Sequence, residues 1–138
     1  MEPIGKGIFH VHIVVKDMER SLRFYTGLLG MEKVPFEDGG LVFLRTPGRR
    51  DLFTLNAGDW KPDRPETCGR EAARENGLAQ THGGITHFGY MLPSLEEYNR
   101  TIAAAEQFGG RLAIRCDHHQ HAYLHDPDGY TVELHYGR

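Results

Sequence analysis

The stretch "GIFHVHIVV" (residues 7–15) decides the fold, because a second stretch, "GITHFGYML" (84–92), repeats its pattern. Both read Gly-Ile, one further residue, His, and then a mainly apolar run typical of a β-strand. Such similarity at a fixed offset along a chain indicates a structural unit that occurs twice. The sequence therefore predicts two related halves.

A helix signal follows each of the two stretches. After the first, Asp17 can act as the N-cap of a helix in "MERSLRFYTGLLG", and Gly30 can end it. After the second, "SLEE" (94–97) has the Ser-x-x-Glu form of a capping box, and Gly109-Gly110 ends the helix. The first strand of each half is therefore predicted to lead into a helix.

Three short strand-like runs follow each helix, at 31–36, 41–45 and 51–56 in the first half and at 111–115, 121–125 and 130–136 in the second. Each half thus reads strand–helix–strand–strand–strand. We predict one domain over residues 1–138, with module 1 at about 5–57 and module 2 at about 84–137. The polar segment 58–83 between them is predicted to be a linker or a lid.

The composition excludes several classes of protein. The chain has 138 residues and a formal charge of −3, which gives no reason to expect the basic surface of a protein that binds nucleic acid. No apolar run approaches the roughly 18 residues of a membrane span, and we expect no signal peptide. The two cysteines fit a reducing cytosol, so a cytoplasmic location is expected.

Three motifs stand out: the His10…Asp17…Ser21…Phe24-Tyr25…Leu29-Gly30 pattern, the repeated Gly-x-x-His strand and "DPDGYTVEL" near the end. Together they resemble the vicinal oxygen chelate superfamily, which includes glyoxalases, bleomycin- and fosfomycin-resistance proteins and extradiol dioxygenases. The resemblance covers nearly the whole chain except the 58–83 segment. It implies an α+β fold in which two βαβββ modules form a curved eight-stranded sheet around a metal-binding cleft, with the helices outside.

The resemblance carries the family's metal ligands over to His10, His87 and Glu133. Strand alternation agrees, because each of them lies opposite the most apolar row of its strand. Two imidazoles and a carboxylate suit one divalent ion, Fe(II) or Mn(II) ahead of Zn, Ni or Co. The alternative is that both histidines belong to the core and that Glu133 is solvated.

Thr54 aligns with Glu133 where glyoxalase I and the related epimerase have a fourth protein ligand, which counts against a lyase or isomerase. Tyr123 precedes Glu133 in "YLHDPDGYTVE" at a spacing similar to that of the extradiol dioxygenases, where a tyrosine contacts the substrate or oxygen. The acid–base histidine of those enzymes aligns with Ala72, so His12 or His121 is the candidate to move protons. Trp60 could cap a ligand or anchor the linker, and the remaining histidines are expected in loops or at the surface (His82, His118, His119 and His125).

The leading hypothesis is an extradiol-dioxygenase-like enzyme acting on a small molecule with vicinal oxygens. One alternative is a metal-dependent thiol transferase of the fosfomycin-resistance kind or a glyoxalase-like lyase. The other is a non-catalytic drug-binding protein of the bleomycin-resistance kind. A homodimer is expected by analogy with the family.

Overall fold

The first repeat folds as a strand, a helix and three further strands in the computed structural model, which describes residues 8–36, 39–58 and 87–137. Its strands form one four-stranded sheet in the order β1-β4-β3-β2, with β1 and β4 parallel. The elements are β1 (His10–Val15), α1 (Met18–Leu22), the π-helical turn η1 (Arg23–Leu28), β2 (Glu32–Lys33), β3 (Val42–Arg45) and β4 (Leu52–Ala57).

The second repeat has the same plan, with the strand order β5-β8-β7-β6 and with β5 and β8 parallel. The elements are β5 (Phe88–Leu92), α3 (Leu95–Ala104), the 3₁₀ turns η2 (Ala105–Phe108) and η3 (Asp117–His119), β6 (Arg111–Cys116), β7 (His121–His125) and β8 (Thr131–Tyr136). The predicted α+β fold of two βαβββ modules is therefore confirmed. The eight strands are divided between two four-stranded sheets, whereas the prediction described a single curved sheet.

Both predicted helix starts are capped as expected. The Asp17 side chain accepts a 2.9 Å hydrogen bond from the backbone N–H of Arg20. The Ser94 hydroxyl accepts one of 3.2 Å from the backbone N–H of Glu97. Each cap satisfies an N–H group that has no partner within its own helix. None of the described helices is long and apolar enough to span a membrane.

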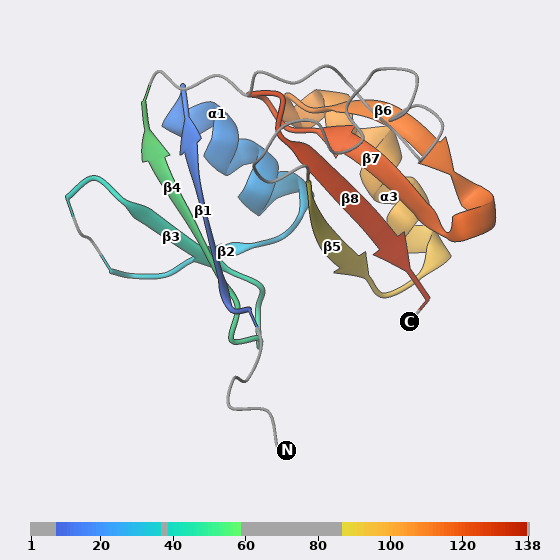
Figure 1. Ribbon diagram of the computed structural model, residues 1–138, viewed down its shortest axis with the longest axis horizontal. Coiled ribbons are helices and arrows are strands. Elements are labelled where there is room, and N and C mark those ends of the chain that lie inside the picture. The colour runs from blue at the N-terminus through green and yellow to red at the C-terminus, as the bar shows by residue number, and fades with distance from the viewer. Residues whose placement is uncertain (1–7, 37–38, 59–86, 138) are drawn as a thin grey trace, which may run out of the picture.

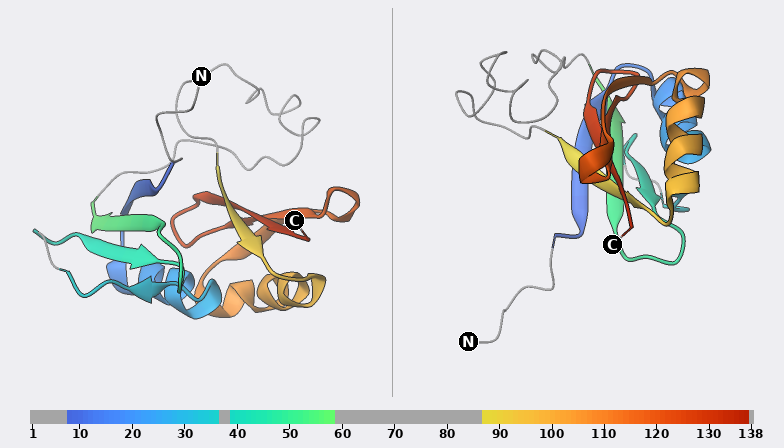
Figure 2. Two further views of the ribbon diagram at one scale, coloured as in Figure 1. Left: turned by 90° about the horizontal axis from the view of Figure 1, so that it is seen from below. Right: turned by 90° about the vertical axis from the view of Figure 1, so that its right-hand side faces the viewer.

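The helices α1 and α3 lie on the same side of the two sheets (Figures 1 and 2). The strand residues that face them are buried and form the core, as Val15, Leu55 and Leu134 do at 0% exposure. A fully buried apolar side chain of this size contributes about 1.5–3 kcal/mol. Because side chains alternate along a strand, the residues next to these core positions point to the opposite, open face of each sheet.

The turn "DPDG" before β8 holds the two modules together. The Tyr25 hydroxyl donates a 2.7 Å hydrogen bond to Asp126 Oδ2, and the Tyr130 hydroxyl donates one of 2.8 Å to the Val14 carbonyl. The Ser21 hydroxyl donates one of 3.3 Å to Asp128. Burial raises the pKa of the Asp126 carboxyl to about 6, although the hydrogen bond from Tyr25 opposes the shift. Module 1 is thus fixed to module 2 by polar contacts from α1, η1 and β1, of which the bond of Tyr25 is buried and the other two are partly buried.

Candidate metal centre

Glu133 lies at the middle of a cluster of imidazoles on the open face of module 2. Its Oε2 is 2.9 Å from Nε2 of His87, and its Oε1 is 2.7 Å from Nε2 of His135. Nδ1 of His121 lies 3.8 Å from the same Oε1. The Glu133 side chain is 15% exposed, so this carboxylate is partly withdrawn from water among nitrogen donors.

The strand register explains why these side chains meet. In the antiparallel pair β7 and β8, His121 lies opposite His135 and Tyr123 lies opposite Glu133. Residues two apart share a face, so the four side chains form a square on one face of the sheet. On the other side of β8, Gly89 of β5 is the partner of Glu133. A Cβ at Gly89 would meet only the Glu133 carbonyl oxygen, at 3.9 Å, so the face beside Glu133 is free of a β5 side chain.

Tyr123 stands between two of the imidazoles. Its ring centroid is 5.2 Å from that of His87, at an interplanar angle of 85°, and 5.2 Å from that of His121, at 74°. Both contacts are edge-to-face, the arrangement that aromatic rings prefer. The predicted catalytic tyrosine therefore lies in the same cluster as Glu133.

His10 and His12 lie on the sheet of module 1. Nε2 of His10 forms a 2.6 Å hydrogen bond with the Thr54 hydroxyl oxygen, and Nε2 of His12 forms one of 2.6 Å with Oδ1 of Asn56. The contact of His10 with Thr54 occupies the same place in module 1 as the contact of His87 with Glu133 in module 2. The predicted alignment of Thr54 with Glu133 thus fits the parallel pairing of each first strand with its last strand.

The structure brings together four of the six predicted site residues, namely His87, Glu133, Tyr123 and His121. Among the described residues, one group of three His, Cys, Asp or Glu side chains has its ligand atoms all within 4.8 Å of one another, and it consists of His121, Glu133 and His135. Neither His10 nor His87 belongs to that group. His135 was not among the predicted site residues, although its period-2 spacing from Glu133 on the same strand could have identified it.

Burial lowers the pKa of His121 below its usual value, while the charge of Glu133 opposes the shift. The neutral imidazole is the form that binds a metal ion. Burial also lowers the pKa of His125, with Arg111 adding to the effect. The prediction that His125 lies in a loop or at the surface was wrong, because it lies on β7 at 3% exposure. His118 and His119 are exposed as predicted, whereas Trp60, Ala72 and His82 lie outside the described residues.

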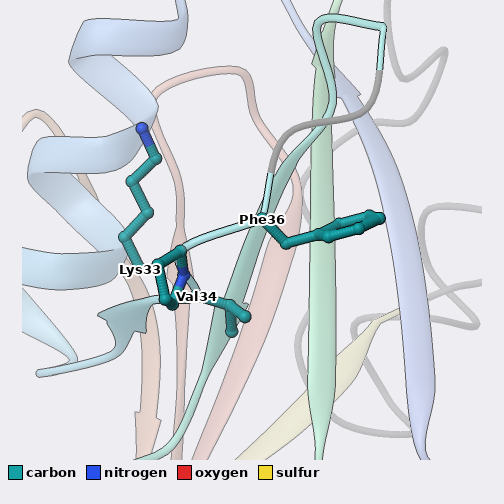
Figure 3. A pocket seen from close by; sticks show the side chains of 4 residues that line it. Lys33, Val34 and Phe36 are labelled. Atoms are coloured by element: carbon teal, nitrogen blue, oxygen red, sulfur yellow. The ribbon is translucent and has the colours of Figure 1, made fainter.

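A shallow hollow beside β2 is lined by Lys33, Val34, Pro35 and Phe36. In Figure 3 the Lys33 side chain runs towards the helix, whereas the Phe36 ring points across the strands. The Phe36 ring packs against Phe43, with centroids 5.4 Å apart. None of these four residues belongs to the cluster around Glu133, so we assign no part of the site to this hollow.

A family model described as "Glyoxalase/Bleomycin resistance protein/Dioxygenase superfamily" matches residues 7–134. A catechol-2,3-dioxygenase of Bacillus subtilis is 26% identical over 95% of this chain, which spans only 41% of that protein's length. A lactoylglutathione lyase of Pseudomonas putida is 31% identical over 91% of this chain and 82% of its own length. Among solved structures, a mutant of the fosfomycin resistance protein FosX of Listeria monocytogenes, complexed with Mn(II) and 1S,2S-dihydroxypropylphosphonic acid, has a TM-score of 0.69 at 18% identity, covering 98% of this chain and 95% of that one.

Proposed function

Because this chain belongs to the Glyoxalase/Bleomycin resistance protein/Dioxygenase superfamily, we propose that it is a divalent-metal-dependent enzyme acting on a small molecule with two neighbouring oxygens. The observation that carries the proposal is the 2.9 Å approach of His87 Nε2 to Glu133 Oε2. An imidazole and a carboxylate that meet on the open face of a sheet are two of the three predicted ligands. An extradiol-dioxygenase-like reaction is the reading we favour.

The donor set of His10, His87 and Glu133 fits one divalent ion. Two imidazoles and one carboxylate suit Fe(II) or Mn(II), and Zn, Ni and Co are compatible with the same ligands. His10 lies on the sheet of module 1, where it is exposed and hydrogen-bonded to Thr54. We therefore propose a homodimer in which the partner's His10 completes the set. Large apolar side chains left exposed on β5 and β6 (Met91, Leu112 and Ile114) support a covered face on module 2.

Each remaining residue has a role set by its place in the cluster. When bound, the metal supplies Lewis acidity that stabilises negative charge on the substrate oxygens. The Tyr123 hydroxyl donates a hydrogen bond to a substrate oxygen. His121 takes up a proton at Nδ1, which lies 3.8 Å from Glu133, and His12 is the alternative carrier from module 1. The absence of a side chain at Gly89 lets the substrate approach Glu133 closely.

A thiol transferase or a lyase is the second candidate. The likeness in fold to the Mn(II)-containing FosX structure and the 31% identity to a lactoylglutathione lyase favour it. Thr54, where the resemblance implies a fourth ligand for the lyase, counts against the lyase branch. A non-catalytic drug-binding protein of the bleomycin-resistance kind would lack the three ligands. The proposal includes a cytosolic location, in keeping with the two cysteines.

The test is the metal content of the wild type beside His87→Ala and Glu133→Ala, after loading with Fe(II) or Mn(II) under anaerobic conditions. The matched control is His118→Ala, because His118 is exposed and lies outside the cluster. We expect each site variant to lose the ion bound by His10, His87 and Glu133, and the control to keep it. If both site variants keep a full complement of metal, the proposed ligands are wrong.

The reaction is tested by oxygen uptake with a panel of catechols on the Fe(II)-loaded protein. Uptake that disappears in Tyr123→Phe supports the dioxygenase reading. Thiol addition that proceeds without oxygen supports the transferase instead. A protein that binds no divalent ion, before or after reconstitution, supports the drug-binding alternative.

A further inference from the structure

We propose that His121, Glu133 and His135 form a second metal site, which shares the Glu133 carboxylate with the site of His87. The three residues all belong to module 2, so this site does not need His10 or a dimer. The inference goes beyond the proposed function, and it holds for any reaction at the first site.

The two oxygens of Glu133 serve different partners. Oε2 lies 2.9 Å from Nε2 of His87, whereas Oε1 lies 2.7 Å from Nε2 of His135 and 3.8 Å from Nδ1 of His121. A carboxylate contacted in this way can bridge two ions through its two oxygens. One oxygen would serve the family site and the other the pair of imidazoles on β7 and β8.

Tyr123 separates the two sets of imidazoles. Its ring packs edge-on against both His87 and His121, with centroids 5.2 Å away in each case. His121 and His135 are close to each other instead, with ring centroids 5.1 Å apart. The described residues contain a group with ligand atoms all within 4.8 Å that includes His121 and His135 but not His87. A single ion therefore does not draw on all three imidazoles in this arrangement.

His121 keeps its ring nitrogens free of hydrogen bonds within the part of the chain that the structure describes. Its Nε2 is buried without a hydrogen-bond partner, and its Nδ1 is 3.8 Å from Glu133, beyond hydrogen-bonding distance. A buried polar atom in a native protein normally has a partner. An imidazole with unused lone-pair capacity beside a carboxylate is a donor ready for a cation.

The donors also fit by type and by rigidity. Two imidazoles and one carboxylate oxygen suit Zn, Co, Ni or Cu, with bonds of about 2.0–2.2 Å and open positions for water. His121 and His135 are direct cross-strand partners in the β7–β8 pair, so the backbone holds both in place.

The test uses Co(II), whose visible absorption reports bound nitrogen and oxygen ligands, together with metal analysis of the full-length protein. We expect the wild type to bind two Co(II) ions per chain. The double variant H121A/H135A should bind one, His87→Ala should lose the other, and Glu133→Ala should lose both. The matched control, H118A/H119A, removes two neighbouring exposed histidines and should still bind two.

The outcomes separate this inference from the proposed function. Retention of one ion in His87→Ala and its loss in H121A/H135A would support the second site even if the first site fails. A stoichiometry that is the same in the wild type and in H121A/H135A would overturn the second site, and so would the loss of every ion in H121A/H135A. If H121A/H135A does not fold by circular dichroism, the single variants His121→Gln and His135→Gln replace it, with the same expected loss of one ion.

Discussion

Tyr25 and Asp126 join the two modules through a hydrogen bond of 2.7 Å from the tyrosine hydroxyl to Oδ2 of the carboxyl. Both side chains are buried, at 0% and 4% exposure. Tyr25→Phe removes the donor and keeps the ring in place. Because a buried acceptor then loses a partner, we expect the free energy of unfolding to fall by about 1.5–3 kcal/mol in urea titrations. Tyr136→Phe, on β8, is the control and should change it by less than about 0.5 kcal/mol.

The raised pKa of Asp126 makes a testable contribution to the pH dependence of stability. The pKa is about 6 in the folded protein, against 3.8 for the ordinary carboxyl, so the folded state holds the proton more tightly than the unfolded state. The resulting stabilisation is complete below pH 3.8 and is lost as the pH rises through about 6. At about 1.4 kcal/mol per pH unit, this amounts to roughly 3 kcal/mol.

Asp126→Asn removes this titration, so the measurement is the difference in unfolding free energy between wild type and variant across pH 4 to 7. The charged neighbour Asp128 and the backbone N–H groups of Asp128 and Tyr130 that bond to this carboxyl are present in both proteins, so their effects cancel in the difference. We expect the advantage of the wild type over the variant to shrink as the pH rises. A constant difference would show that the carboxyl of Asp126 titrates normally.

Removing the metal should lower the thermal stability of the protein, because an ion bound by Glu133 stabilises only the folded state. A ligand that binds only the folded state adds about 2.7 kcal/mol when its concentration is a hundred times its dissociation constant. We expect chelator treatment to lower the Tm of the wild type by several degrees and to leave the Tm of Glu133→Gln unchanged. Differential scanning calorimetry with and without added Mn(II) measures this. An equal effect of chelator on both proteins would place the bound ion elsewhere.

Gly89→Leu should weaken substrate binding and leave the stability of the fold nearly unchanged. A Cβ at this position meets nothing closer than the Glu133 carbonyl oxygen at 3.9 Å, so the backbone accepts a side chain there. The leucine would lie on the open face beside Glu133, because the two residues are partners in the β5–β8 pair. We expect unfolding free energy within about 1 kcal/mol of the wild type and at least a tenfold rise in substrate KM. Unchanged kinetics would argue that the substrate binds away from β5.

The repeat predicted most of the fold, because strand alternation and helix caps are local signals. Asp17 and Ser94 cap their helices as expected, and each predicted strand has a counterpart among the described strands, although β2 is only Glu32–Lys33 where 31–36 was predicted. The π-helical turn η1 was not predicted. There the backbone N–H groups of Leu29 and Met31 reach back to the carbonyls of Phe24 and Tyr25, and an apolar period does not distinguish such a turn from an α-helix.

The features of the site that the sequence could not predict depend on contacts between residues of different strands. Glu133 was identified by its strand, but its approach to His135 and His121 depends on the register of β7 against β8. Strand alternation groups His125 with His121 and Tyr123, yet His125 lies on β7 at only 3% exposure. The family resemblance grouped His10 with the other ligands, although it lies on a different sheet of the chain.

The hydrogen bond of His10 with Thr54 has a consequence for protein engineering. In module 1, His10 on β1 meets the Thr54 hydroxyl on β4. In module 2, His87 meets the Glu133 carboxylate in the corresponding place. Replacing Thr54, which is 1% exposed, with glutamate would therefore place a carboxylate beside His10, so that one substitution gives module 1 an imidazole–carboxylate pair able to bind a metal ion. Because burial disfavours the negative charge, a cation bound by this carboxylate and His10 would stabilise the redesigned chain.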